Sequence, residues 1–233
     1  MFYIRRTSLT LLLGLTILGC EQSIFQQKHN FVLKEGDILF RDSDCGPLCD
    51  AIERVTTGYQ GANISHVGIA AKDANGNFIV IEAVSTGVGI TPLRSFLERS
   101  SDAQGYPKVM VGRLKKAYRH LIPTAVKNAL ALKGKPYDKV FAIDNGAYYC
   151  SELIYEIFLL ANHNNPVFEL QPMTFKAPDT GKTLQAWQDY FSNLGVPIPE
   201  GQPGINPGGI SRSPAITIIQ PYGNPGSGVR GLK

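Results

Sequence analysis

Residues 66–84, HVGIAAKDANGNFIVIEAV, contain two apolar runs on either side of a polar turn. This pattern predicts a β-hairpin. A three-residue loop with Gly76 in the left-handed conformation fits the turn best, and it pairs residues whose numbers sum to 150. Glu82 would then be a diagonal, same-face neighbour of His66. A two-residue turn at Asn75-Gly76 would put the two side chains on opposite faces.

The polar residues of this hairpin have two interpretations each. Glu82 interrupts an apolar strand, so it either has a partner in the interior or lies on an edge strand facing solvent. His66 opens its strand, and the small neighbours Gly68 and Ala70 leave room beside the imidazole for another element. Taken alone, His66 would be a hydrogen-bonded structural histidine. The hairpin register makes both residues candidates for one site.

Cys150 begins the clearest helical pattern in the chain, Cys150–Ala161, in which apolar residues recur at helical spacing. Unpaired N–H groups and the positive end of the helix dipole stabilise a thiolate at this position. Alternatively, the cysteine simply fills the apolar face of the helix. A nucleophilic role requires a base nearby.

The remaining pattern predicts an α+β fold built on an antiparallel sheet, because hairpin-type strands and helices alternate irregularly. Beyond Gly195 the chain is rich in Gly and Pro, which excludes long regular elements, although residues 215–219 remain compatible with a strand. The other expected elements are strands over 37–41 and 108–114 and helices over 47–56, 92–99 and 123–133.

The N-terminus has the composition of a targeting segment. Residues 1–19 contain Arg5, Arg6 and a short apolar run that ends at Cys20. This arrangement resembles a bacterial lipobox, in which the cysteine is lipidated, and an ordinary secretory signal is the alternative. The absence of Asp after the cysteine favours the outer membrane, facing the periplasm. The expected organisation is a signal over 1–19, a tether over 20–33, one domain over 34–222 and a flexible tail over 223–233.

Composition narrows the class of protein. The chain has 233 residues, 43% hydrophobic, and a net charge of +4 that falls to +2 without the two arginines of the signal. That length suits one domain, and that charge is far below the basic footprint of a nucleic-acid binder. Cys45 and Cys49 suit a disulfide in an oxidising compartment, but two cysteines four apart on a regular helix are poorly placed for one. As a zinc site the pair is incomplete.

Four motifs occur in order: GDILF at 36–40, SHVGI at 65–69, VIEA at 80–83 and YYCSEL at 148–153. Together they resemble the YiiX-like and YebB-like permuted papain-fold hydrolases, a branch of the NlpC-type superfamily, from about Leu33 to Tyr222. The resemblance implies a papain-like antiparallel sheet or barrel with packed helices. It also implies Cys150 as nucleophile, His66 as base and Glu82 as the residue that orients the imidazole.

The implied reaction is acyl transfer through an acyl-enzyme, with the Cys150 N–H as an oxyanion donor and no metal or organic cofactor. The expected substrate is an amide in the cell envelope, such as a peptidoglycan peptide. Alternatives are a lipid esterase or acyltransferase of the same fold, or a binding lipoprotein without turnover. Tyr137, Tyr148 and Tyr149 either line a substrate pocket or are packing residues. Five basic residues either face an anionic ligand or form a solvated edge: Lys108, Arg113, Lys115, Lys116 and Arg119.

Overall fold

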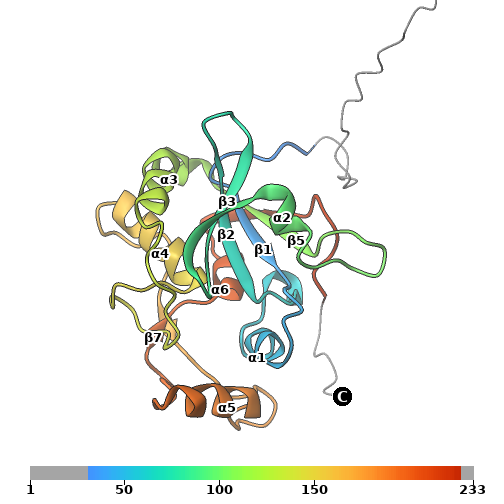
Figure 1. The fold of residues 1–233 in the computed structure, drawn as a ribbon, viewed down its shortest axis with the longest axis vertical. Coiled ribbons are helices and arrows are strands. Elements are labelled where there is room, and N and C mark those ends of the chain that lie inside the picture. The colour runs from blue at the N-terminus through green and yellow to red at the C-terminus, as the bar shows by residue number, and fades with distance from the viewer. Residues whose placement is uncertain (1–30, 227–233) are drawn as a thin grey trace, which may run out of the picture.

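A six-stranded antiparallel sheet, in the order β4-β3-β2-β1-β5-β8, forms the centre of the molecule. Residues 31–226 are described by a computed structural model, and helices flank this sheet (Figure 1). The strands are β1 (Ile38–Arg41), β2 (His66–Lys72), β3 (Phe78–Val84), β4 (Gly87–Pro92), β5 (Val109–Leu114) and β8 (Ile216–Ile219). A second, two-stranded sheet pairs β6 (Gln171–Pro172) with β7 (Pro203–Gly204). The α+β arrangement built on an antiparallel sheet, expected from the sequence, is confirmed.

Six α-helices and two short 3₁₀ helices complete the described part of the chain. The α-helices are α1 (Pro47–Val55), α2 (Leu93–Leu97), α3 (Ile122–Ala131), α4 (Cys150–Ala161), α5 (Gln185–Leu194) and α6 (Pro207–Ser211). The 3₁₀ helices are η1 (Tyr59–Gly61) and η2 (Lys116–Leu121). None of the helices in residues 31–226 is long and apolar enough to cross a membrane.

The β2–β3 hairpin has the three-residue loop predicted from its turn residues. Ile69 pairs with Ile81 and Lys72 with Phe78, so paired numbers sum to 150. Gly76 has a φ of 83° and donates its N–H to the Asp73 carbonyl over 3.0 Å. This register puts the side chains of β2 and β3 in the alternation that brings Glu82 to the His66 side of the sheet.

The two faces of the sheet are covered differently. Helices α3 and α4 pack on one face, where α4 buries an apolar stripe containing Leu153, Ile157 and Phe158. The short helix α2 covers the other face, and its Phe96 is fully buried there. Leu33, which the sequence analysis assigned to the tether, is also buried in this second cluster. The packed domain therefore begins slightly before residue 34.

Helix α5 was not predicted, although its aromatic and aliphatic residues recur at helical spacing. Trp187 and Phe191 are buried against α1 in a third apolar cluster, together with Phe175. Phe175 and Trp187 make an edge-to-face contact with ring centroids 5.0 Å apart. The pair α1 and α5 forms a lobe beside one end of the sheet (Figure 1).

A disulfide joins Cys45 to Cys49, with the two Cα atoms 5.3 Å apart. Two cysteines four apart on a regular helix would be poorly placed for a disulfide, but α1 begins only at Pro47, and Cys45 precedes it. Gly46, with a φ of 85°, turns the chain between them. Cys150 is the free cysteine of the described part.

The predicted signal and Cys20 lie outside the described residues, as do most of the tether and residues 227–233. Of the predicted tail, residues 223–226 are described, and Gly226 makes two hydrogen bonds to the domain. Its carbonyl accepts from the Asn63 N–H over 2.6 Å, and its N–H donates to the Asp42 carboxylate over 3.2 Å. These two contacts attach the chain to the domain as far as residue 226.

Candidate active site

His66 and Glu82 are joined by a short hydrogen bond. Nε2 of His66 lies 2.6 Å from Oε2 of Glu82, and both side chains are largely or wholly buried. The bond occupies Nε2, which leaves Nδ1 as the ring atom available to a second partner. Burial lowers the pKa of His66, but hydrogen bonds with Cys150 and Glu82 outweigh it and raise the pKa above its usual value. The site therefore stabilises the protonated imidazole relative to a histidine in water.

The Glu82 carboxylate is fully enclosed, and three side chains satisfy it. Besides His66, the Thr91 hydroxyl donates to Oε1 over 2.5 Å and the Arg99 guanidinium lies 2.8 Å from the same oxygen. Burial raises the pKa of Glu82, yet the bonds from His66 and Thr91 and the positive charges of His66 and Arg99 lower it to about 2. Glu82 is thus a permanent anion that fixes the orientation of the imidazole, rather than an edge-strand charge.

Cys150 is the first residue of α4, with Tyr149 as its N-cap. Its thiol lies close enough to His66 to contribute to the raised pKa of that histidine, and both residues line the same cavity. The adjacent N–H groups of the first turn have no partner within the helix, so they are available to an incoming oxygen atom. Glu152, two residues further along the helix, accepts the Tyr149 N–H over 3.3 Å, and burial raises its pKa to about 8. A carboxyl that is largely neutral adds little negative charge beside the thiol.

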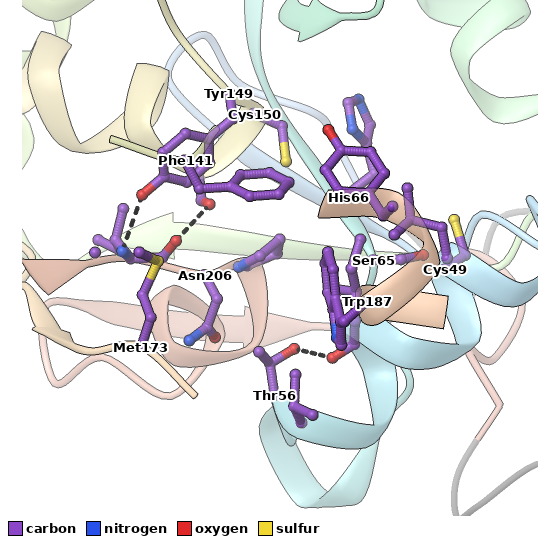
Figure 2. A pocket seen from close by; sticks show the side chains of 18 of the residues that line it. Cys49, Thr56, Ser65, His66, Phe141, Tyr149, Cys150, Met173, Trp187 and Asn206 are labelled. Carbon is purple, nitrogen blue, oxygen red and sulfur yellow. Dashed lines mark hydrogen bonds between the residues drawn. The ribbon is translucent and has the colours of Figure 1, made fainter. Parts of the chain in front are cut away.

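Cys150 and His66 open onto a cavity of about 720 Å³. Figure 2 shows the Cys150 sulfur at this cavity, with Phe141 and Trp187 along its wall. Most of the lining is apolar or aromatic, and it comes from α1, α5 and the loops before α4 and α6. The Cys45–Cys49 disulfide also lines it. A cavity of this size accommodates a small substrate with its reactive carbonyl against the thiol.

Two of the three predicted pocket tyrosines line the cavity. Tyr137 and Tyr149 do so, and burial raises the pKa of each. The Tyr149 hydroxyl accepts the Ile205 N–H over 3.1 Å, whereas the Tyr137 hydroxyl makes no hydrogen bond within residues 31–226. Tyr148 does not line the cavity. Burial and the negative charges of Glu156, Glu152 and Asp144 raise the pKa of its phenol.

Sequence reasoning missed several residues that complete the site. Thr91 and Arg99, which hold Glu82, come from β4 and from just beyond α2, where no motif marks them. Arg41 ends the predicted strand of the first motif and lines the cavity. Trp187 was identifiable only through the helical spacing of α5. These roles depend on strand order and loop path, which no local pattern encodes.

The basic residues considered for an anionic ligand do not form one surface. Lys108 is buried and pairs with Asp42 and Asp44, and Arg113 pairs with Asp37 over 2.7 Å. These two side chains are therefore structural ion pairs. For Lys108 and Arg113, the interpretation as part of an edge that binds an anionic ligand is therefore wrong.

The fold and the Cys150–His66–Glu82 arrangement define a papain-like class of protein in which the histidine precedes the cysteine in the chain. Comparison with family models identifies the particular group. Residues 32–220 match the family described as permuted papain-like amidase enzyme, YaeF/YiiX, C92 family. The chain belongs to this family, and it is a hydrolase of the amidase or peptidase kind.

One solved structure supports the fold. The crystal structure of metalloprotein yiiX from Escherichia coli O157:H7 superposes with a TM-score of 0.67 at 24% identity, covering 82% of this chain and 98% of that chain. A search of curated proteins found no match. The word metalloprotein describes that relative. In residues 31–226 of this chain no three His, Cys, Asp or Glu side chains gather as metal ligands.

Proposed function

We propose that this protein is a cysteine hydrolase that cleaves amide bonds through Cys150, His66 and Glu82. The observation that carries the proposal is the 2.6 Å hydrogen bond between His66 and Glu82, with the His66 imidazole and the Cys150 thiol lining the same cavity. A thiol at a helix N-terminus, next to an imidazole that a buried carboxylate orients, is the arrangement that nucleophilic catalysis by cysteine requires.

In the proposed reaction, Cys150 rests as a thiolate paired with the His66 imidazolium. The thiolate attacks the substrate carbonyl, and the oxyanion receives hydrogen bonds from the Cys150 N–H and the Tyr137 hydroxyl. The amide C–N bond breaks as His66 gives its proton to the leaving amine. A water molecule then attacks the thioester, returning its proton to His66 and releasing the acid.

The apolar lining of the cavity favours a second candidate function that uses the same chemistry. Leu48, Ile52 and Leu194 join the aromatic residues of its wall, and an apolar wall suits a long acyl chain. An ester or acyl-transfer reaction on a lipid would use the same thiolate and the same oxyanion donors. A non-catalytic binding protein would have no need of the buried pair formed by His66 and Glu82.

Matched acyl p-nitroanilides and p-nitrophenyl esters test the reaction type. We expect release of nitroaniline by the full chain, with an acyl adduct on Cys150 found by mass spectrometry. Cys150→Ala should abolish both. Ester hydrolysis without any amide hydrolysis would favour the lipid esterase, and activity unchanged in Cys150→Ala would contradict a cysteine hydrolase.

We further propose that the protein is anchored to the bacterial envelope through Cys20. The support is the sequence of residues 1–20, a short basic and apolar segment that ends in cysteine. Acyl chains on this residue would hold the domain at the membrane surface. Metabolic labelling with palmitate should mark the wild type and not Cys20→Ala. Equal recovery of both in the soluble fraction would contradict the anchor.

A further inference from the structure

Arg41 lies beside the candidate catalytic histidine, on the neighbouring strand. The antiparallel β1–β2 ladder pairs Arg41 with His66, so both side chains are on one face of the sheet. Each contacts Phe96, with the Arg41 guanidinium 4.7 Å from the ring centroid and the His66 ring centroid 6.0 Å away. Arg41, His66 and Cys150 all line the cavity.

The Arg41 guanidinium is buried without an ion pair in the described part of the chain. The residue is 6% exposed. Its Nε donates to the Ser43 hydroxyl over 3.1 Å and its Nη1 to the Phe96 carbonyl over 3.4 Å. The guanidinium has five N–H donors, so donors remain on Nη1 and Nη2. Nη1 and Nη2 are not among the fully buried atoms that lack a hydrogen-bond partner. Their free N–H groups are therefore accessible from the cavity.

Nearby carboxylates are committed to other cations. Glu82 is held by His66, Thr91 and Arg99. Asp42, the residue that follows β1, pairs with Lys108 over 3.1 Å. Glu82 makes no salt bridge with Arg41 within residues 31–226, although its negative charge lies near enough to raise the pKa of Arg41.

The cavity as a whole lacks negative side chains. No Asp or Glu occurs among the described residues that line it, whereas Arg41, Lys139 and His66 do. Burial lowers the pKa of Arg41 to about 10, so it remains charged at neutral pH. A buried cation is costly unless paired. The two N–H groups of a guanidinium edge match the two oxygens of a carboxylate.

We propose that Arg41 binds a carboxylate of the substrate next to Cys150 and so determines specificity. The substrate is then an amide with a free carboxylate close to the bond that is cleaved. This inference rests on the proposed function and adds a substrate class to it. Arg41 touches the substrate in this account, but it transfers no proton and forms no bond.

Paired alkylating reagents test the inference without a known substrate. Iodoacetate carries a carboxylate and iodoacetamide is its neutral counterpart, and mass spectrometry of the Cys150 peptide gives both rates in the full chain. We expect the rate ratio of iodoacetate to iodoacetamide to exceed that of free cysteine. Arg41→Gln should lower this ratio about tenfold, the size expected for loss of one close charge. Arg41→Lys should retain part of it.

Lys139→Gln is the matched control, because it removes the same charge from an exposed position on the same cavity. It should change the ratio less than twofold. Iodoacetamide rates report separately on the thiolate and on folding in every variant. If iodoacetamide reacts no faster than with free cysteine, the proposed function fails. If it reacts fast and the ratio is the same in wild type and Arg41→Gln, the carboxylate site alone is wrong.

Protection of Cys150 identifies the anion. In the wild type, N-acetylglycine should slow alkylation by iodoacetamide more than N-acetylglycinamide does. In Arg41→Gln, the two compounds should slow alkylation to the same extent. Protection by methyl phosphate without protection by N-acetylglycine would overturn the assignment of a carboxylate.

Discussion

Nε2 of His66 lies 2.6 Å from Oε2 of Glu82, although the two residues are on different strands and 16 positions apart. The relationship follows from the hairpin register, since a loop one residue shorter would turn Glu82 to the other face. Thr91 and Arg99 then satisfy the oxygens that His66 leaves free. A carboxylate held this firmly can orient one tautomer of the imidazole.

Glu82→Gln should weaken the proposed base. Glu82 raises the pKa of His66, so its loss lowers that pKa and disfavours the imidazolium. We expect kcat/KM to fall about 10²- to 10⁴-fold on an amide substrate, as for loss of a positioned acid–base group. Glu156→Gln, a partly exposed position on α4, is the control and should retain activity. Equal activity in both variants would remove Glu82 from the mechanism.

Gly68 and Gly89 flank Glu82 on its two neighbouring strands and provide a matched pair. A Cβ on Gly68 would lie 2.6 Å from the Val80 side chain and 3.2 Å from the Glu82 Cβ, whereas one on Gly89 meets nothing within 4 Å. We expect Gly68→Ala to lower the free energy of unfolding by about 1–3 kcal/mol, as overpacking does. Gly89→Ala should cost less than half as much. Chemical denaturation measures both, and equal costs would contradict the close packing.

Acid should destabilise the protein partly through Glu82. Its pKa is about 2 when folded, against an ordinary 4.5. The stabilisation is therefore complete above about pH 4.5 and is lost as the pH falls towards 2. Between pH 5 and pH 3, the free energy of unfolding should fall by about 2 kcal/mol more in wild type than in Glu82→Gln. The raised pKa of His66 acts in a higher pH range, so it does not obscure this difference. Parallel pH profiles would be evidence against a low pKa for Glu82.

The Cys45–Cys49 disulfide should stabilise the start of α1. Replacing both cysteines by serine should lower the free energy of unfolding by about 2 kcal/mol, the chain-entropy value for so short a loop. Dithiothreitol should lower the Tm of the wild type and leave that of the double variant unchanged. A reductant effect of equal size in both proteins would show that the disulfide is not its source.

Local patterns predicted the parts of the site that depend on local structure. The α4 range was predicted as the structure has it, because its apolar spacing and the preceding motif are both encoded in consecutive residues. The β2–β3 register followed from the turn residues around Gly76. In both cases the interactions that decide the structure lie within about 20 residues.

The remaining parts depend on contacts between distant segments. Arg41 becomes a cavity residue only because β1 pairs with β2, and Arg99 reaches Glu82 only because α2 folds over the sheet. Tyr148 and Tyr149 are adjacent, yet only Tyr149 lines the cavity. The orientation of such side chains depends on the backbone path before α4, which composition does not determine.

The pH dependence of Cys150 alkylation by iodoacetamide tests the central claim most directly. The rate should be measured at the Cys150 peptide in wild type and in His66→Ala. The account predicts rapid alkylation well below pH 8 in the wild type and a profile shifted to higher pH in His66→Ala. A thiol that is inert, or whose profile is the same in both proteins, would contradict an activated nucleophile paired with His66.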